Sequence, residues 1–189
     1  GGRSAPAARG AGGWGRGAST EAAGALGGAV DDCAGGAGVA GATASGSARA
    51  LWRYREGHPE AINLLGAPLK RDVSLPADRL GEFIGAVPTR VAALVPDASV
   101  WMFGHAADGN VHVNVTGLPL DDEHVTAAVF ERVAALHGSI SAEHGIGSAK
   151  RSYLHLVRSA VEIATYRAIK RAFDPVGILN PNVLVPDDA

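Results

Sequence analysis

The amino-acid sequence predicts an α+β fold, in which helices pack on one face of an antiparallel or mixed sheet. Three observations support this expectation. Beyond residue 51, three segments repeat apolar residues at helical spacing, short runs typical of strands lie between them, and a tight-turn signal joins two of the strands. Strands and helices therefore alternate along the chain, and one hairpin is inserted among them.

The N-terminal part of the chain is rich in Gly and Ala. Residues 1–18 are mostly Gly, Ala and Arg without apolar periodicity. We expect a disordered or misread low-complexity segment there, because such a stretch cannot bury enough surface to offset its ordering entropy. In residues 19–50, Ala22–Val30 fits a helix and Val39–Ala44 fits a strand. We assign residues 19–189 to one partial domain with a hydrophobic core.

A short strand and a helix are expected next. Asp72–Leu75 alternates polar and apolar residues, as a strand does. Pro76 fits the first turn of a helix, where its missing N–H costs nothing. Pro88 lies within the helical pattern and is expected to kink or interrupt it. The apolar stripe of this helix consists of Leu80, Phe83, Ile84, Val87 and Val91.

Two further helices are expected towards the C-terminus. The first begins at a cap formed by Asp121 or Asp122 and ends at Gly138. A strand at Ser139–Ser141 follows it, and the second helix spans Ser152–Phe173. The core-facing positions are Val125, Val129, Val133 and Leu136 in the first helix, and Leu154, Val157, Val161, Ala164 and Ile169 in the second.

The hairpin expected over Ser99–Val115 contains two histidines. Asp108-Gly109 indicates a two-residue turn, in which both central residues must tolerate positive φ. The resulting register places His105 opposite His112, where Cβ atoms about 5 Å apart allow two imidazoles to share a metal ion. Asn114 points to the same side, and the intervening valines face the core.

A second polar group follows the expected strand at Ser139–Ser141. Glu143 and His144 stand there in a Gly-rich loop. Two imidazoles and one carboxylate suit Zn²⁺, Mn²⁺ or Fe²⁺ and leave coordination positions for a substrate. Each of these residues taken alone is more often structural or solvated, so the joint pattern is what favours a metal site.

The composition excludes other classes of function. The formal net charge is −2 and no basic stripe occurs, so we expect no nucleic-acid partner. Cys33 is the one cysteine, which excludes an internal disulfide framework, fits a reducing compartment and favours a cytoplasmic location. No apolar run approaches the roughly 20 residues that a membrane span needs, so no span is expected.

Four motifs occur in a characteristic order along the chain. They are Arg53–Glu56, Leu69–Pro76, the His and Glu motifs described above, and Phe173–Pro181. Together they resemble the C-terminal cap domain of FAD-linked 2-hydroxy-acid oxidases and dehydrogenases of the vanillyl-alcohol-oxidase type. This family includes D-lactate dehydrogenase, the glycolate oxidase flavin subunit and D-2-hydroxyglutarate dehydrogenase. The resemblance covers residues 25–186 and implies a ferredoxin-like cap domain.

The resemblance implies a metal site and a base. In metal-dependent members, the positions that match His105, His112 and Glu143 hold a divalent metal, often zinc. The position that matches His144 lies beside the substrate and would accept its hydroxyl proton. The pattern of residue types alone had favoured the same metal ligands.

The resemblance also implies substrate and flavin contacts. The positions that match Arg55 and Lys70 bind the substrate carboxylate, for which a guanidinium offers two parallel hydrogen bonds and a lysine a point charge. The position that matches Asn114 touches the substrate. Asn180 would lie near the flavin.

Two departures from the family pattern concern turn residues. Ala107 stands where the family usually has Gly, and it would cost about 1 kcal/mol or more if the position required positive φ. Asn182 stands where the family's Asn-Pro-Gly-Lys has its Gly, and Asn is the next best residue for a left-handed conformation.

The implied activity is oxidation of a small D-2-hydroxy acid (lactate, glycolate or 2-hydroxyglutarate class) to the 2-oxo acid, with hydride transfer to FAD. Family members bind FAD chiefly through an N-terminal domain with a Gly-rich loop, for which residues 1–50 lack the flanking strand and helix. We therefore expect the chain to need a FAD-binding domain in the same or another chain. An electron-transfer subunit is a further partner that the resemblance allows. The alternative is a non-catalytic metal-binding or interaction module left by loss of the FAD domain.

Overall fold

The computed structural model describes residues 49, 52–53, 55–183 and 185 of the chain. The low-complexity segment expected over residues 1–18 lies outside the described residues, as do the helix expected at Ala22–Val30 and the strand expected at Val39–Ala44. These three expectations and the domain boundary at residue 19 therefore stay predictions.

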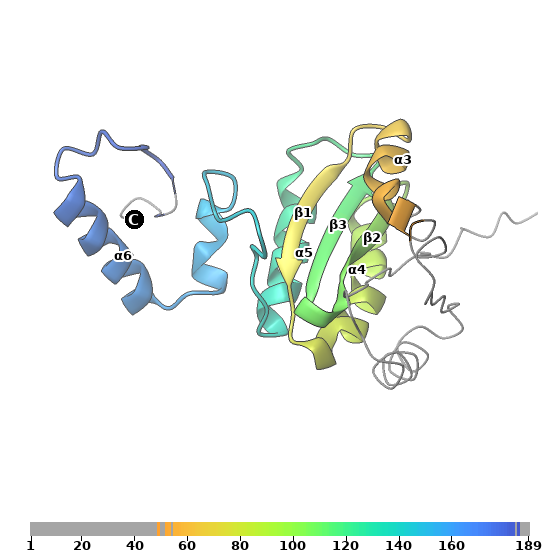
Figure 1. Ribbon diagram of the computed structural model, residues 1–189, viewed down its shortest axis with the longest axis horizontal. Coiled ribbons are helices and arrows are strands. Elements are labelled where there is room, and N and C mark those ends of the chain that lie inside the picture. The colour runs from red at the N-terminus through yellow and green to blue at the C-terminus, as the bar shows by residue number, and fades with distance from the viewer. Residues whose placement is uncertain (1–48, 50–51, 54, 184, 186–189) are drawn as a thin grey trace, which may run out of the picture.

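A three-stranded antiparallel sheet organises the described part of the chain (Figure 1). Its strands are β1 (Leu69–Ser74), β2 (Ser99–His105) and β3 (Asn110–Thr116). The central strand is β3, which pairs with β1 on one side and with β2 on the other. The predicted α+β class is confirmed, and β1 begins three residues before the predicted strand.

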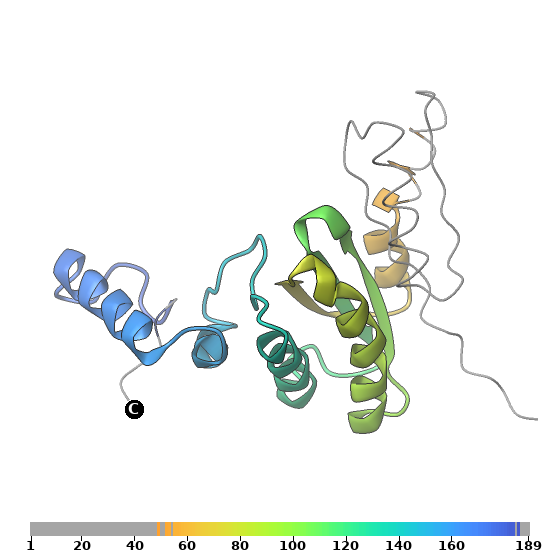
Figure 2. The ribbon, with the colours of Figure 1, turned by 90° about the horizontal axis from the view of Figure 1, so that it is seen from below.

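The two long helices that follow β1 and β3 cover one face of this sheet. They are α4 (Leu80–Leu94) and α5 (Glu123–Ala135), which lie on the same side of the sheet in Figures 1 and 2. The valines of β3 that face this side are buried in the core with apolar residues of both helices. Because burying one such side chain contributes about 1.5–3 kcal/mol, this face holds the domain together.

Helix α4 runs through Pro88 without interruption, so of the two expected effects, a kink or an interruption, the interruption does not occur and the kink stays a prediction. Proline removes one backbone hydrogen bond from a helix interior and costs about 3 kcal/mol there. The side chains of Phe83 and Val87 before the proline, and of Val91 after it, are fully buried against the sheet. Packing on both sides of Pro88 therefore holds the helix together.

Helix α5 begins as the sequence predicts, but it ends at Ala135, before the predicted Gly138. The carboxylate of Asp122 accepts a hydrogen bond from the backbone N–H of Val125 at 2.8 Å, so Asp122 is the cap. After Leu136, His137 takes a left-handed conformation with φ 58° and the chain leaves the helix through Gly138.

The single helix expected over Ser152–Phe173 is wrong, because the chain forms two elements there. They are the 3₁₀ helix η3 (Arg151–Leu156) and the α-helix α6 (Ala160–Phe173). Ser159 and Glu162 form a capping box at the break: Ser159 Oγ accepts from the Glu162 N–H, and Glu162 accepts from the Ser159 N–H. A capping box favours a helix start, and apolar periodicity alone does not reveal it.

On the other side of the sheet stands the short helix α3 (His58–Leu64) (Figures 1 and 2). Its first residue, His58, packs its ring 5.8 Å from the ring of Phe103 in β2. The side of the sheet that α4 and α5 leave uncovered therefore has α3 at the β2 edge, and the polar residues of the strands lie on this side.

Candidate metal centre

A four-residue loop brings His105 and His112 together. Ala106–Asp108 forms a 3₁₀ turn, and Gly109 closes the loop with φ 67°. This loop pairs His105 with Asn110, so the predicted pairing of His105 with His112 is wrong. The register differs from the predicted one by two residues, and an even shift keeps both histidines on the same face of the sheet. They are diagonal neighbours with ring centroids 6.1 Å apart.

The loop differs from the prediction because Gly109 alone supplies positive φ. Neither Ala107 nor Asp108 is in a left-handed conformation, so Ala107 carries no strain from this cause. A Cβ on Gly109 would lie 2.0 Å from the backbone oxygen of Leu75. Glycine is therefore required at position 109 for two reasons. Its φ is positive, and the backbone of Leu75, which follows β1, passes too close to leave room for a Cβ.

A close approach of two chain segments also places Glu143. Gly138 passes β1 so closely that a Cβ there would lie 2.4 Å from the backbone oxygen of Ser74. Ser139 then pairs with Ser74 through two backbone hydrogen bonds of 2.8 and 2.9 Å. The strand expected at Ser139–Ser141 is thus reduced to one bridge, and the following loop brings Glu143 to the polar face.

His105, His112 and Glu143 form the one group of potential metal ligands found among the described residues. The ligand atoms that these three side chains offer all lie within 4.8 Å of one another. Both histidines are half-buried and Glu143 is exposed. The cluster joins β2, β3 and the 139–147 loop, as the sequence motifs predicted.

His144 lies at the edge of this cluster. Its side chain is 68% exposed, and its ring stacks with that of His112 at 6.4 Å between centroids. Its Nδ1 lies 3.8 Å from a carboxylate oxygen of Asp72. An exposed imidazole beside a carboxylate is suited to accept a proton from a bound molecule.

Asp72 and Asn110 hold two of the potential ligands, and sequence reasoning assigned neither of them to the site. Asp72 pairs with His112 in the sheet, is 4% exposed, and places Oδ1 3.2 Å from Nδ1 of His112. Asn110 donates from its side-chain amide to Glu143 Oε1. Their spacing from Lys70 and His112 by even numbers of residues is the signal that could have placed them on the same face.

Burial changes the pKa of two groups here. Burial lowers the pKa of His112, while the nearby Asp72 and Glu143 act to raise it. Burial also lowers the pKa of Lys150, whose ammonium group donates to the backbone oxygen of Asp72 at 3.1 Å. His112 is therefore available as a neutral imidazole, the form that binds a metal.

Three of the residues expected to contact substrate lie around the cluster. Arg55 donates to Nε2 of His105 at 3.2 Å and places its guanidinium 5.4 Å from the centre of the Phe103 ring. Lys70 of β1 pairs with Asn114 of β3, two residues along from the pair of Asp72 and His112, so both pairs lie on the same face of the sheet. Lys70 is exposed, whereas Asn114 is buried.

The structure does not bring Asn180 to the cluster. Asn180 follows α6, and α6 lies away from the sheet, beyond α5, in Figures 1 and 2. The carboxylate of Asp174 shapes this segment by accepting backbone hydrogen bonds from Ile178 and Leu179. Asn180 and Asn182 both have positive φ, so the interpretation of Asn182 as a left-handed residue is confirmed.

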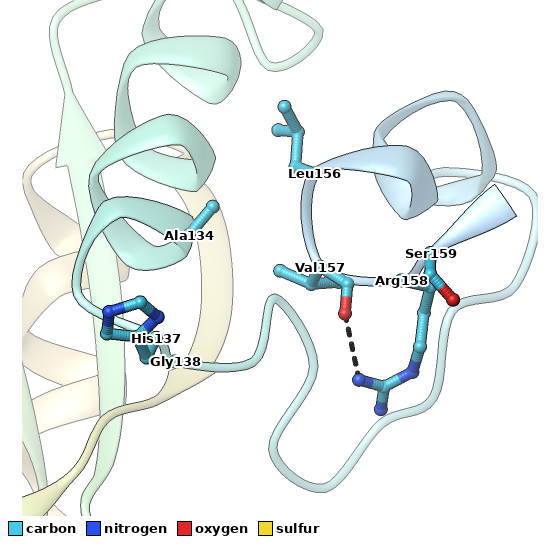
Figure 3. Close-up of a pocket in the computed structure, with 7 residues that line it drawn as sticks. All are labelled: Ala134, His137, Gly138, Leu156, Val157, Arg158 and Ser159. Carbon is cyan, nitrogen blue, oxygen red and sulfur yellow. Dashed lines mark hydrogen bonds between the residues drawn. The ribbon is translucent and has the colours of Figure 1, made fainter. Parts of the chain in front are cut away.

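A cavity of about 380 Å³ opens elsewhere, between the end of α5 and the start of α6 (Figure 3). Its lining consists of Ala134, His137, Gly138, Leu156, Val157, Arg158 and Ser159. The guanidinium of Arg158 donates to the backbone oxygen of Val157 at 2.9 Å within it. No predicted site residue lines this cavity.

Comparisons with known proteins agree with the motifs. Residues 16–184 match the family described as FAD linked oxidases, C-terminal domain. The chain is 39% identical to a D-2-hydroxyglutarate dehydrogenase of Stutzerimonas stutzeri over 139 residues, which is 69% of this chain and 30% of that protein. It is 36% identical over 151 residues to the mitochondrial D-2-hydroxyglutarate dehydrogenase of Danio rerio, covering 78% and 28%.

A third relative has a different name. Over 141 residues, the chain is 39% identical to the D-2-hydroxyglutarate–pyruvate transhydrogenase DLD3 of Saccharomyces cerevisiae, covering 69% of this chain and 28% of that protein. The matched region thus spans less than a third of each of these three relatives. Within the described residues, no helix has the length and apolar character that crossing a membrane requires.

Proposed function

Since the chain belongs to the family of FAD-linked oxidases, whose C-terminal domain it matches, we propose that it is the substrate- and metal-binding part of a FAD-dependent enzyme that oxidises a D-2-hydroxy acid to the 2-oxo acid. The observation that supports this proposal most is the convergence of His105, His112 and Glu143 beside the exposed His144. Among lactate, glycolate and 2-hydroxyglutarate, the names of the relatives favour 2-hydroxyglutarate.

The residues present fit a divalent metal. The ligand atoms of two imidazoles and a carboxylate lie within 4.8 Å of one another. The buried Asp72 contacts His112, and the buried Asn110 contacts Glu143. His105, His112 and Glu143 would hold the ion, and two histidines with a glutamate are a ligand set of catalytic zinc sites. A metal there supplies a Lewis acid that lowers the pKa of a substrate hydroxyl.

The chain's own residues would bind and deprotonate the substrate. Arg55 and Lys70 bring positive charge to the polar face, where they bind the carboxylate of the substrate. Asn114 contributes an amide at the same position along the sheet as Lys70. His144 accepts the hydroxyl proton, and the carboxylate of Asp72 stabilises the resulting imidazolium.

The flavin is expected to be held mainly outside the described residues. None of the described strands leads through a glycine-rich turn into a helix, the arrangement that cradles a pyrophosphate. A bound FAD supplies the hydride acceptor. We propose a FAD-binding domain in the same or another chain as the partner, with Asn180 contributing a flavin contact. An electron-transfer subunit is a second proposed partner.

The location stays a proposal. The single cysteine favours the cytoplasm, whereas several relatives are named as mitochondrial proteins.

Native mass spectrometry of the purified chain tests the metal site. We expect one divalent metal per chain, lost in His105→Ala and in Glu143→Gln. His124→Ala is the matched control, because His124 is exposed in the first turn of α5, outside the ligand cluster. Wild-type protein that binds no metal from a zinc-containing buffer would overturn this part of the proposal.

Reconstitution with the FAD-binding domain of a relative tests the reaction. We expect reduction of the flavin by D-2-hydroxyglutarate in the presence of the wild-type chain, and none with His144→Ala. A chain that binds metal but supports no flavin reduction would instead favour the non-catalytic module.

A further inference from the structure

We propose that Asp72 is the positioning residue of the candidate metal centre: its carboxylate sets the tautomer of His112 and fixes the backbone of the loop that carries Glu143. This inference deepens the proposed function and rests on its metal site. Asp72 acts through these neighbours, because its carboxylate is directed at the ring of His112 and at the loop backbone.

The first argument is the burial of the carboxylate. Asp72 is 4% exposed, although aspartate is almost never fully buried unless it is paired. Burying a charged carboxylate without partners is costly, so the groups that meet it must compensate for lost hydration. A buried aspartate in the edge strand β1 therefore indicates a specific set of partners.

The second argument is the way in which Asp72 holds the loop. Oδ2 accepts hydrogen bonds from the backbone N–H of Glu143 at 2.8 Å and of His144 at 3.4 Å. The backbone oxygen of Asp72 accepts a third from the side-chain ammonium of Lys150, which follows the 139–147 loop. One residue of β1 thus holds the backbone of the loop at Glu143 and His144 and contacts the side chain of Lys150 beyond it. A ligand on an exposed loop needs such an anchor to keep its geometry.

The third argument concerns the proton on His112. Oδ1 of Asp72 is buried and receives no regular hydrogen bond from the described residues. Nδ1 of His112 lies 3.2 Å from this oxygen, in an ion-pair contact without the geometry of a hydrogen bond. A lone pair on Nδ1 would be repelled by the negative carboxylate, whereas a proton on Nδ1 is attracted to it. The Nδ1–H tautomer is therefore stabilised, and the lone pair of Nε2 is left free for a metal.

The substitution Asp72→Asn reverses this preference while keeping the shape of the side chain. The loop presents two N–H donors, so the amide oxygen of the new side chain takes the place of Oδ2. Its NH₂ group then faces Nδ1 of His112, which must become an acceptor. The proton moves to Nε2, and the lone pair that a metal needs is lost.

Long-range ¹H–¹⁵N correlation spectra of the metal-free chain measure the tautomer directly. We expect His112 as Nδ1–H in the wild type and as Nε2–H in Asp72→Asn, at about pH 8, where a histidine is neutral. The signal is assigned by its loss in His112→Gln. A merely structural role for Asp72 leaves the tautomer of His112 unchanged. An Nε2–H tautomer in the wild type overturns the proposal, even if the variant does not fold.

Titration with Co²⁺, read from its visible absorption, gives the second readout. We expect Asp72→Asn to weaken binding about 10- to 100-fold, as loss of a partner to a metal-ligating histidine does. Asp78→Asn is the matched control, because Asp78 is an exposed aspartate outside the site. If Asp72→Asn binds Co²⁺ as tightly as the wild type while His105→Ala loses binding, the role of Asp72 is overturned and the metal site is not.

The two proposals fail in different ways. If neither the wild type nor His105→Ala binds Co²⁺, the metal site of the proposed function is overturned. The tautomer of His112 then still decides whether Asp72 acts on this histidine.

Discussion

Two helices of this chain have the same apolar periodicity but different surroundings. In α4, the side chains of Phe83, Val87 and Val91 are fully buried between the helix and the sheet. In α6, Val161 is 76% exposed and Ile169 is 52% exposed, although both were expected to face the core. Periodicity indicates which face of a helix is apolar, and it does not indicate whether the same part of the chain covers that face.

The contrast continues at the last residue of α6 and beyond it. Four more large apolar residues are exposed there: Phe173, Val176, Ile178 and Leu179. A capping box shapes the start of α6, and the backbone hydrogen bonds that Asp174 accepts shape the chain after it. The sheet region therefore owes its stability to burial, and the C-terminal region owes its local structure to caps and hydrogen bonds.

Removing one aromatic ring from each region should show the largest difference. Phe83→Ala leaves a cavity in the core and should lower the free energy of unfolding by about 3–5 kcal/mol. Phe173→Ala removes a ring that is 83% exposed, and its effect should stay within about 0.5 kcal/mol. Urea unfolding followed by circular dichroism measures both. Equal losses would show that Phe173 is covered in solution.

Two glycines with similar φ give the next comparison. Gly109 and Gly177 have φ of 67° and 73°. A Cβ on Gly109 would meet the backbone of Leu75, whereas a Cβ on Gly177 has no described atom within 4 Å. Gly177→Ala should cost about 1–2 kcal/mol for the left-handed conformation alone. Gly109→Ala should cost more and also weaken metal binding, since the same turn places His105.

A milder effect of Gly109→Ala than of Gly177→Ala would contradict the close approach. The comparison needs only the free energies of unfolding of the two variants and their affinities for Co²⁺.

Much of the candidate site could be predicted because its chemistry follows the alternation of strands. The register of the hairpin was wrong, yet His105 and His112 stayed on one face because the shift was even. Glu143 was found from its residue type beside His144. The sequence could not show that Asp72 is buried, because burial depends on the loop that returns from a distant part of the chain.

The fold was predicted best where local signals and packing agree. Asp122 caps α5, and the apolar stripe of this helix is buried as expected. The last helix was predicted as one element because its apolar pattern continues across Ser159. There the local cap determined the structure, and no burial of Val161 against the core opposed it.

Removing one cap from each region should have a smaller effect. Ser159→Ala and Asp122→Ala should each cost about 1 kcal/mol. The response should differ in place: the first-turn amides of α6 lose protection from hydrogen exchange, while α5 stays helical because Val125, Val129 and Val133 are buried. Ser152→Ala, an exposed serine in η3, is the control. Equal fraying of both helices would show that packing does not distinguish them.

The smallest effect should be a pH response confined to the C-terminal segment. The ammonium group of Lys170 and the backbone N–H groups of Ile178 and Leu179 hold the pKa of Asp174 below its ordinary value of 3.8. Because the charged form is favoured in the folded chain, its contribution is present above pH 3.8 and is lost as the pH falls through the lowered pKa.

The amide chemical shifts of Ile178 and Leu179 should therefore move together on acidification from about pH 5 to pH 2, while those of Val113 in the buried central strand stay unchanged. Asp174→Asn removes the titrating group but keeps an acceptor oxygen, so its amide shifts should not respond over this range. If they move as in the wild type, then Asp174 does not hold the segment. The C-terminal region would then need another source of order, and its exposed apolar side chains are the remaining candidates.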